Sequence, residues 1–334
     1  MIARSSAAWQ PASWQQELAA GYRDAAELLD ALGLDAGAFP EPVAVDAAFP
    51  LRVPRGFVRR MRRGDPRDPL LRQVLPLAVE SGDRAGFVLD PVGDRAAARV
   101  PGLIHKYRGR VLLITTGACA IHCRYCFRRH YPYTETAPRD DWEAALDYIR
   151  RDTSIHEVIL SGGDPLLLND ARLAALLARL GAISHVARLR VHTRLPVVLP
   201  ERLNAGLLDV LTGQRLPVAM VIHANHPREI DTGVATALAP LRCPGITLLN
   251  QTVLLRGIND DIETLAALSE SLFAAGVLPY YLHLLDKVAG AAHFEVAEDT
   301  ARGLLEGLRE ALPGYLVPRL VRELAGAPSK VAVT

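Results

Sequence analysis

Lysine is nearly absent from this chain. Of its 38 basic residues only Lys106, Lys287 and Lys330 are lysines, so arginine carries almost all of the positive charge. An amine can lose its proton and attack a carbonyl, which a guanidinium in a protein cannot do. Each of the three lysines is therefore a candidate for amine chemistry, and a GC-rich codon bias is the competing explanation for at least one of them.

The chain also lacks a long apolar run and a strong net charge. Half of its 334 residues are hydrophobic, yet no run reaches the roughly 18 residues of a membrane span. The first nine residues contain no apolar stretch of the kind found in a signal peptide. A net charge of +1 gives no general reason to bind nucleic acid or an anionic membrane. We therefore expect a cytoplasmic protein with no membrane contact and no direct nucleic-acid partner.

Cysteine is scarce and unevenly placed. Three of the four cysteines, Cys119, Cys123 and Cys126, have C-x3-C-x2-C spacing directly after an apolar run, whereas Cys243 stands alone before a proline. A cubane iron–sulfur cluster takes one thiolate per iron, so a loop with three cysteines leaves one iron open to a further ligand. This spacing resembles that of the radical S-adenosylmethionine enzymes. We expect Cys243 to be an ordinary buried thiol.

A structural zinc site is the main alternative for the cysteine loop. Zinc prefers four ligands, often cysteine together with histidine. His122 and His130 lie within or next to the loop and could complete such a shell. A clustered triple suits a reducing compartment better than a disulfide framework in either case.

From Arg110 onward, short aliphatic runs alternate with segments of helical period, which predicts six strand–helix units. The predicted strands are 111–116, 158–161, 189–193, 218–223, 246–252 and 279–285. The predicted helices are 142–151, 171–180, 201–211, 231–238, 262–275 and 299–312. Such alternation favours parallel strands with right-handed crossovers, and six units fall short of the eight that close a barrel. We expect an α/β fold, an open and partial (β/α)6 TIM-like barrel.

The remaining parts of the chain flank this barrel. Residues 1–100 are expected to form a mostly helical or irregular extension with little catalytic content, and residues 101–314 the barrel. Residues 315–334 would form a short C-terminal segment that carries Lys330. Eight arginines lie between Arg52 and Arg72, interrupted by prolines and a glycine. We interpret them as an exposed, solvated stretch, with docking of an acidic protein or an RNA as the alternative.

Polar groups follow every predicted strand. The cysteine loop follows the first strand, Gly162-Gly163-Asp164 the second and Arg194 the third, and His223, Gln251 and Asp286 stand at the ends of the last three. The carboxyl ends of parallel strands form one face of a barrel, where active sites are built. The glycine pair would let the backbone approach a ligand closely.

Several segments together resemble the lysine 2,3-aminomutases, a radical S-adenosylmethionine family. The resemblance is closest to the short bacterial branch that acts in (R)-β-lysylation of elongation factor P. The segments that carry it are PGLIHKY at 101–107, CRYCFRRH at 123–130, LSGGDP at 160–165, LNQTVLLR at 249–256, YYLHLLDK at 280–287, AHF at 292–294 and PSK at 328–330.

The resemblance implies cofactors and roles for particular residues. Cys119, Cys123 and Cys126 would bind a [4Fe-4S] cluster, and S-adenosyl-L-methionine would lie against Gly162, Gly163, Asp164, His223 and Gln251. Lys330 would hold pyridoxal 5'-phosphate as a Schiff base, with Arg194, Lys106 and Tyr107 helping to seat it. Arg128 would bind the carboxylate of the substrate, and Asp286 and Glu323 its distal ammonium. The implied fold is the radical S-adenosylmethionine barrel with a C-terminal cofactor-binding tail.

The implied reaction is isomerisation of L-α-lysine to (R)-β-lysine by moving nitrogen from C2 to C3. The implied partners are L-lysine, a one-electron reductant such as flavodoxin, and the machinery that lysylates elongation factor P. Catabolic members of the family carry Asp where this chain has Glu323 and continue well beyond the cofactor lysine, whereas this chain ends at Thr334. The alternatives are a catabolic lysine aminomutase, a mutase for another amino acid such as glutamate, and a non-catalytic iron–sulfur redox or scaffold protein.

Overall fold

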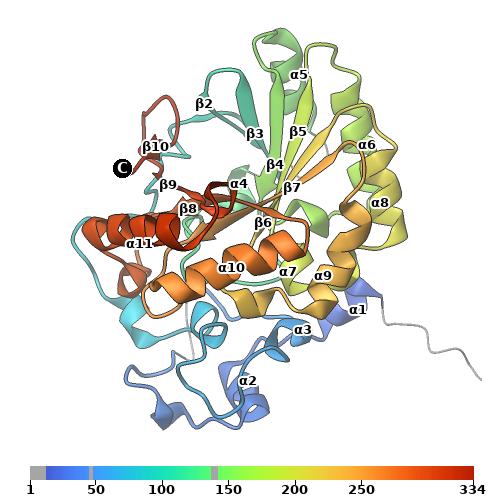
Figure 1. Cartoon of the computed structure of the whole chain (residues 1–334). Helices are drawn as coiled ribbons and strands as arrows, with labels where there is room; N and C mark the ends of the chain where they lie inside the picture. The colour runs from blue at the N-terminus through green and yellow to red at the C-terminus, as the bar shows by residue number, and fades with distance from the viewer. Residues whose placement is uncertain (1–12, 45–47, 137–141) are drawn as a thin grey trace, which may run out of the picture.

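A computed structural model describes residues 13–44, 48–136 and 142–334 (Figure 1). The predicted lack of a signal peptide concerns residues 1–9, which lie outside the described residues. Ten strands of the described chain form one sheet: β1 (Ala98–Val100), β2 (Leu103–Tyr107), β3 (Arg110–Thr116), β4 (Glu157–Gly162), β5 (Arg188–Thr193), β6 (Val218–His223), β7 (Ile246–Val253), β8 (Leu278–His283), β9 (Arg319–Arg322) and β10 (Val331–Ala332).

The order of the strands in space follows their order in the chain. Strands β3 to β9 run parallel, each paired with the next, while β1, β2 and β10 are antiparallel to their neighbours. No pairing joins β1 to β10 within the described ranges, so the sheet remains open. The predicted open, partial barrel is therefore confirmed.

All six predicted strands are present as β3 to β8, with ends shifted by two residues at most. The six predicted strand–helix units are present, and β9 adds a seventh parallel strand, which pairs with β8. Its sequence, Arg-Leu-Val-Arg, contains only two apolar residues between charges, too few to give a period. Strand β2 was also not predicted, and it places Lys106 and Tyr107 beside β3.

The helices lie mainly around the outside of the sheet (Figure 1). The α-helices are α1 (Trp14–Ala19), α2 (Ala25–Leu32), α3 (Arg55–Val58), α4 (Tyr133–Thr136), α5 (Glu143–Arg151), α6 (Asp170–Gly181), α7 (Leu195–Val198), α8 (Ala205–Thr212), α9 (Thr232–Leu238), α10 (Ile262–Ala274) and α11 (Glu298–Ala311). The 3-10 helices are η1 (Ala36–Ala38), η2 (Leu71–Gln73), η3 (Ala78–Ser81), η4 (Pro165–Leu167), η5 (Pro200–Arg202), η6 (Pro227–Glu229), η7 (Ala239–Leu241), η8 (Ala292–Phe294) and η9 (Gly314–Leu316).

The N-terminal helices share the main hydrophobic core with the barrel. Helix α2 begins where Asp24 accepts a hydrogen bond from the Glu27 amide, and it ends at Gly33, whose φ of 66° is left-handed. Its apolar residues recur at helical spacing, and Leu28 and Leu32 are buried in the same cluster as the strand residues Val158 and Leu160. Helix α2 is thus amphipathic, and burial of its apolar face attaches the N-terminal extension to the barrel.

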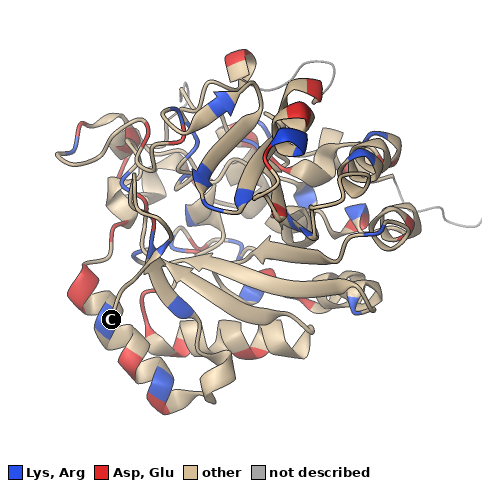
Figure 2. Cartoon of the chain, turned by 90° about the horizontal axis from the view of Figure 1, so that it is seen from above, with Lys and Arg blue, Asp and Glu red and all other residues tan. Residues whose placement is uncertain are grey.

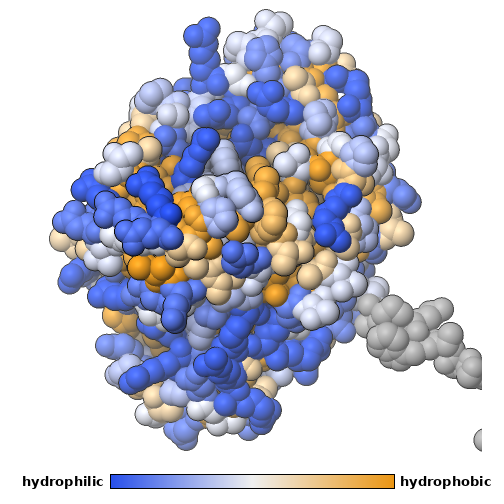
Figure 3. All heavy atoms as spheres, viewed as in Figure 1, coloured by the Kyte–Doolittle hydropathy of each residue, from blue (hydrophilic) through white to orange (hydrophobic). Residues whose placement is uncertain are grey.

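Charge lies mostly on the helices and loops, and the strands carry little of it (Figure 2). The face seen in Figure 3 is covered largely by hydrophilic residues with smaller apolar areas between them. Within the described ranges, every helix is too short or too polar to cross a bilayer.

Candidate active site

The carboxyl ends of the parallel strands open into a cavity of about 450 Å³. Every residue that the sequence assigned to the site lines this cavity: Cys119, Cys123, Cys126, Gly162, Gly163, Asp164, Arg194, His223, Gln251, Lys106, Tyr107, Arg128, Asp286, Glu323 and Lys330. Strand order and chain order coincide, so the loops that follow successive parallel strands lie beside one another. The structure therefore supports the prediction that these residues form one site.

The cysteine loop is held in place by the N-terminal region. The amide of His122 donates to the Arg52 carbonyl and that of Arg124 to the Gln73 carbonyl, both at 2.9 Å. The Arg124 guanidinium is fully buried and pairs with Glu80. The expectation that residues 1–100 contribute little to the site therefore needs correction, because they set the position of the loop.

The thiols of this loop are buried in an environment that opposes their ionisation. Burial, with the charges of Cys126 and Asp164, raises the pKa of Cys119 well above its usual range. Burial likewise raises the pKa of Cys126 to about 11, and a charge on Cys123 adds to this. Ionised thiolates here need a compensating cation, which the iron ions of a cluster supply. The donor set thus fits a [4Fe-4S] cluster.

The alternatives for the cysteines find less support. His122 and His130, the candidate zinc ligands, bond to the Pro50 and Ala289 carbonyls and do not line the cavity. Across the described ranges, no group of three or more His, Cys, Asp or Glu side chains is arranged to hold a single metal ion. A cubane takes one thiolate per iron, so its ligands need not converge on one point. Cys243 is half-buried, which corrects the expectation of a buried thiol, and it lies away from the cavity.

The glycine pair allows the end of β4 to pack directly on the cysteine loop. Gly162 has a φ of 111°, which L side chains rarely adopt. A Cβ atom on Gly163 would lie 2.1 Å from the Ala118 carbonyl oxygen. The amides of Gly163 and Asp164 donate to the Thr116 and Ala118 carbonyls at 2.7 and 2.8 Å. The sequence predicted a close approach to a ligand; the structure adds a close approach between two loops, which any larger residue would block.

Asp164 connects the glycine loop to the end of β5. Its carboxylate accepts from the Thr193 hydroxyl at 2.7 Å and from the Arg194 amide at 2.8 Å. It also accepts from the amides of Leu166 and Leu195. Burial raises the pKa of Asp164, although these hydrogen bonds act in the opposite direction. Through these hydrogen bonds Asp164 joins the end of β4 to the end of β5.

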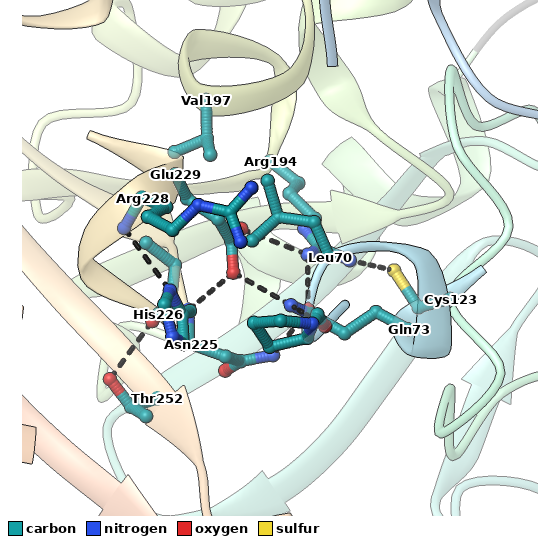
Figure 4. Close-up of polar contacts among 12 residues, drawn as sticks. Leu70, Gln73, Cys123, Arg194, Val197, Asn225, His226, Arg228, Glu229 and Thr252 are labelled. Atoms are coloured by element: carbon teal, nitrogen blue, oxygen red, sulfur yellow. Dashed lines mark hydrogen bonds and ion pairs between the residues drawn. The ribbon is translucent and has the colours of Figure 1, made fainter. Parts of the chain in front are cut away.

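Arg194 lies in a buried polar network beside the cysteine loop (Figure 4). Its NH1 group donates to the Cys123 Sγ atom at 2.6 Å, and its NH2 group to Gln73 Oε1 at 2.6 Å and to Glu229 Oε2 at 3.0 Å. Burial raises the pKa of Glu229, but Arg194 and Gln73 lower it by more, below its usual range. The predicted contact of Arg194 with pyridoxal phosphate stays a prediction, and its hydrogen bonds in this structure run to the cysteine loop, η2 and η6.

A chain of alternating charges joins the C-terminal segment to the cysteine loop. The Lys330 Nζ atom lies 2.8 Å from Glu323, and the Lys106 Nζ atom lies 2.9 Å from Glu323 and 2.5 Å from Asp94. Asp94 in turn accepts from the Nε atom of Arg128 at 2.6 Å. Lys106 and Glu323 are 217 residues apart in the chain. Only Asp94, from the N-terminal region, was absent from the sequence prediction.

The two predicted ammonium-binding acids differ in charge state. Burial disfavours ionisation of Glu323, but Lys330 and Lys106 lower its pKa well below the usual range. Burial raises the pKa of Asp286 to about 7, the charge of Glu323 adds to the rise, and the two lysines oppose it. The sequence led us to expect that two such acids without enough positive charge between them would leave one protonated. The structure provides that pair, and Asp286 is the acid whose pKa is raised.

The raised pKa of Asp286 predicts a pH-dependent stability in the cofactor-free protein. An unfolded aspartate ionises near pH 4. Between about pH 4 and pH 7 the unfolded chain loses a proton that folded Asp286 keeps, so the free energy of unfolding falls as the pH rises. Asp286→Asn removes this titration. We expect the Tm of the variant minus that of the parent to increase from pH 4 to pH 7 and then level off in scanning calorimetry.

Asp299→Asn is the matched control, because Asp299 is 96% exposed on α11. The Tm of Asp299→Asn minus that of the parent should show no such increase between pH 4 and pH 7. A Tm difference for Asp286→Asn that stays constant over the same pH range would contradict the shifted pKa.

Three histidines and a tyrosine pair complete the cavity wall; His283 is buried, and His192 and His223 are half-buried. Burial lowers the pKa of His192 and His283 well below the usual range and that of His223 to about 3, so these imidazoles are neutral. The Nε2 atoms of His223 and His283 and the Tyr107 hydroxyl are buried without a hydrogen-bond partner. Such atoms fit a site that receives a polar ligand. The hydroxyls of Tyr280 and Tyr281 lie 2.9 Å apart.

The sequence prediction did not assign His192, His283, Tyr280 and Tyr281 to the site. His192 lies in the carboxyl-terminal half of β5, and Tyr281 and His283 in that of β8, which was the available signal; Tyr280 lies in the first half of β8.

The arginine-rich segment is less exposed than expected. Arg60 has a side-chain exposure of 8%, and its guanidinium donates to the Val197 carbonyl at 2.5 Å. Arg72 donates to the Gly257 carbonyl at 2.6 Å. Arg62, by contrast, is 67% exposed. The interpretation of residues 52–72 as a solvated stretch is therefore corrected, because several of its arginines attach the N-terminal region to the barrel.

Comparisons with known proteins agree with this geometry. Residues 113–213 match the family model of the radical SAM superfamily. The chain is 48% identical over 321 residues to the L-lysine 2,3-aminomutase of Escherichia coli K12, covering 95% of this chain and 93% of that protein. It is 46% identical over 319 residues to the L-lysine 2,3-aminomutase of Haemophilus influenzae, covering 95% and 94%.

Two more distant similarities were also found. The L-lysine 2,3-aminomutase of Clostridium subterminale is 38% identical over 271 residues, which cover 80% of this chain and 65% of that protein. Among solved structures, a radical SAM methyltransferase from Sphaerobacter thermophilus aligns over 66% of this chain and 68% of its own, with a TM-score of 0.45 and 18% identity.

Proposed function

The chain belongs to the L-lysine 2,3-aminomutase family of radical SAM enzymes, and on that premise we propose that it converts L-α-lysine to (R)-β-lysine for modification of elongation factor P. It is an isomerase whose family uses a [4Fe-4S] cluster, S-adenosylmethionine and pyridoxal phosphate. When bound, these groups supply radical generation and delocalisation of an unpaired electron. The chain's own residues bind and orient them and the substrate.

The observation that carries the substrate proposal is the ion pair between Lys330 and Glu323. The Lys330 ammonium lies 2.8 Å from the Glu323 carboxylate. A lysine substrate would present the same chemical group. Asp286 lines the same cavity, and burial and the charge of Glu323 raise its pKa to about 7. Lys330 would hold pyridoxal phosphate through its amine, which would leave Lys106 as the cation beside Glu323. A substrate ammonium would replace the Lys330 ammonium and favour ionisation of Asp286.

The carboxylate end of the substrate would need a cation, and Arg128 of the cysteine loop is the candidate. Arg128 is buried, and Asp94 holds its Nε atom at 2.6 Å. Its NH1 group donates to the Ser161 hydroxyl at 3.2 Å. Arginine binds carboxylates through a planar fork of donors. We infer that the substrate carboxylate accepts from the terminal nitrogens of Arg128, while Asp94 keeps the guanidinium in one orientation.

The proposed role in modification of elongation factor P rests on the resemblance to the short bacterial branch of the family. The chain carries Glu at position 323, where the catabolic branch carries Asp. A catabolic role or a different amino acid substrate is the competing proposal.

The product assay tests the reaction. Anaerobically reconstituted protein with S-adenosylmethionine, pyridoxal phosphate and a one-electron reductant should convert L-lysine to β-lysine, and chiral chromatography should identify the R enantiomer. L-glutamate in parallel should remain unchanged. Conversion of glutamate at a comparable rate would remove the support for lysine.

The cellular role needs a separate experiment. Expression of the chain in a host without its own aminomutase, together with elongation factor P and its lysylating machinery, should add one lysyl mass to the factor. Unmodified factor despite accumulated β-lysine would separate the enzyme activity from the proposed role.

Asp286→Asn should weaken the use of lysine. The change leaves one of the two acids to pair with the substrate ammonium, and a desolvated charge pair that loses a partner costs about 2–5 kcal/mol. We expect kcat/KM for lysine to fall by roughly 30-fold to a few thousandfold. Glu295→Gln is the matched control, because Glu295 pairs with Lys287, which is 57% exposed, and lies away from the cavity. Parent-like kcat/KM in Asp286→Asn would refute the ammonium-binding role.

A further inference from the structure

The network around Arg194 joins three parts of the chain beside the thiol of Cys123. Arg194 follows β5, Glu229 ends η6, and Gln73 ends η2. Figure 4 shows the guanidinium between the carboxylate of Glu229 and the sulfur of Cys123, with Gln73 beside it. Gln73 and Glu229 have no exposed surface, and Arg194 is 6% exposed. A charge pair is therefore kept out of water directly against the cysteine loop.

The two ends of the guanidinium have different partners. The NH1 group donates to the Cys123 Sγ atom at 2.6 Å, whereas the NH2 group binds Glu229 at 3.0 Å and Gln73 at 2.6 Å. Glu229 is itself held, because its Oε1 atom accepts from the Asn225 amide at 3.0 Å and from Gln73 at 2.9 Å. A rigid planar fork that is fixed at one end has a fixed direction at the other. The network thus aims one N–H group at the sulfur of Cys123.

We propose that the Arg194–Glu229 pair sets the reduction potential of the iron–sulfur cluster, with Arg194 as a positioning residue that donates an N–H···S hydrogen bond to Cys123. This inference rests on the proposed role of the three cysteines as cluster ligands. It gives Arg194 a function at the cluster in place of the seat for pyridoxal phosphate that the family resemblance implied.

The direction of the effect follows from charge. Reduction moves one electron from an external donor to the cluster and adds one negative charge, and no bond to Arg194 forms or breaks. Hydrogen bonds to cluster sulfurs and nearby charge both change the potential. Arg194 touches the sulfur, whereas Glu229 binds the far end of the guanidinium, so the positive charge is nearer and its effect is larger. The arginine therefore favours the reduced cluster, and the glutamate partly opposes it.

Two substitutions should shift the potential in opposite directions. Arg194→Gln removes the donor and its charge, and we expect the equilibrium constant for reduction to fall by about tenfold, which is 59 mV for one electron. Glu229→Gln keeps the acceptor for Asn225 and removes only the negative charge, so the potential should rise. EPR-monitored redox titration of anaerobically reconstituted protein measures both. Arg194→Lys keeps the charge but cannot reach all three partners, and it should lie between Arg194→Gln and the parent.

Iron content decides what a null result means. Arg150→Gln is the control, because Arg150 pairs with the exposed acids Glu143 and Asp147 on α5 and does not line the cavity. The substitution removes the same charge, and the potential of this variant should equal that of the parent. A parent protein without bound iron would refute the cluster site itself. Iron-loaded Arg194→Gln with an unchanged potential would overturn this inference and leave the cluster site intact.

A purely structural role gives a different pattern. If Arg194→Gln takes up no iron, the redox potentials of Arg194→Lys and Glu229→Gln test the inference instead. The inference is overturned if Glu229→Gln shifts the potential downward or leaves it unchanged. It is also overturned if neither Arg194→Lys nor Glu229→Gln binds iron, because a structural role would then account for the network.

Discussion

Lys330→Ala is expected to abolish both covalent binding of pyridoxal phosphate and aminomutase turnover. The Lys330 amine lines the cavity, pairs with Glu323 at 2.8 Å and lies 5.9 Å from the centre of the Tyr281 ring. A covalently attached cofactor requires an amine that can attack a carbonyl, and loss of such a group removes a whole catalytic route. Turnover should fall by roughly a thousandfold or more.

Borohydride reduction followed by peptide mapping measures the attachment directly. In the parent the label should lie on the peptide that contains Lys330. Lys287→Ala is the matched control, since Lys287 is 57% exposed and pairs with Glu295 outside the cavity. Its labelling and turnover should match those of the parent. Label on Lys106 or Lys287, or unchanged labelling of Lys330→Ala, would place the cofactor elsewhere.

Alanine at Cys119, Cys123 or Cys126 is expected to remove the cluster and all activity. The three thiols line one cavity on one loop, and burial disfavours the thiolates of Cys119 and Cys126 unless a cation binds them. Each single variant loses one of three ligands, so iron content after anaerobic reconstitution should fall from the value of about four per chain expected for a cubane. Turnover should become undetectable.

Cys243→Ala provides the comparison within the same chain. It also removes one thiol, but Cys243 lies away from the cavity, so its iron content should equal that of the parent. The EPR spectrum of the reduced parent should change when S-adenosylmethionine is added, because the open iron gains a ligand. Bound zinc in place of iron, or a spectrum that ignores S-adenosylmethionine, would contradict the proposed cluster.

Most of the barrel could be predicted because its signals are local. Apolar runs such as the one in β4 alternate with helices such as α6, whose apolar residues recur at helical spacing and are buried. Each strand end then places the following residue at the same face, which is why Cys119 and Asp286 could be assigned to one cavity. Strand β9 was missed because a four-residue strand is too short to give a period.

The contribution of the N-terminal region could not be predicted in the same way. Gln73 and Asp94 lie in segments without regular periodicity, and nothing near them in the chain indicates a partner. Their partners, Arg194 and Arg128, are brought close only when the N-terminal helices pack on the barrel core. Burial of apolar side chains from α2 thus brings a polar segment to the site.

The sequence alone determined the alternation of strands and helices, the three cysteines of the loop and the scarcity of lysine, because each depends on residue identity and short spacing. The tertiary structure decided which charges meet. Lys106 lies against Glu323, which is 217 residues away in the chain, and Arg194 faces Cys123, which is 71 residues away. Coulomb energies depend on distance and burial, and both quantities exist only after distant segments have packed together.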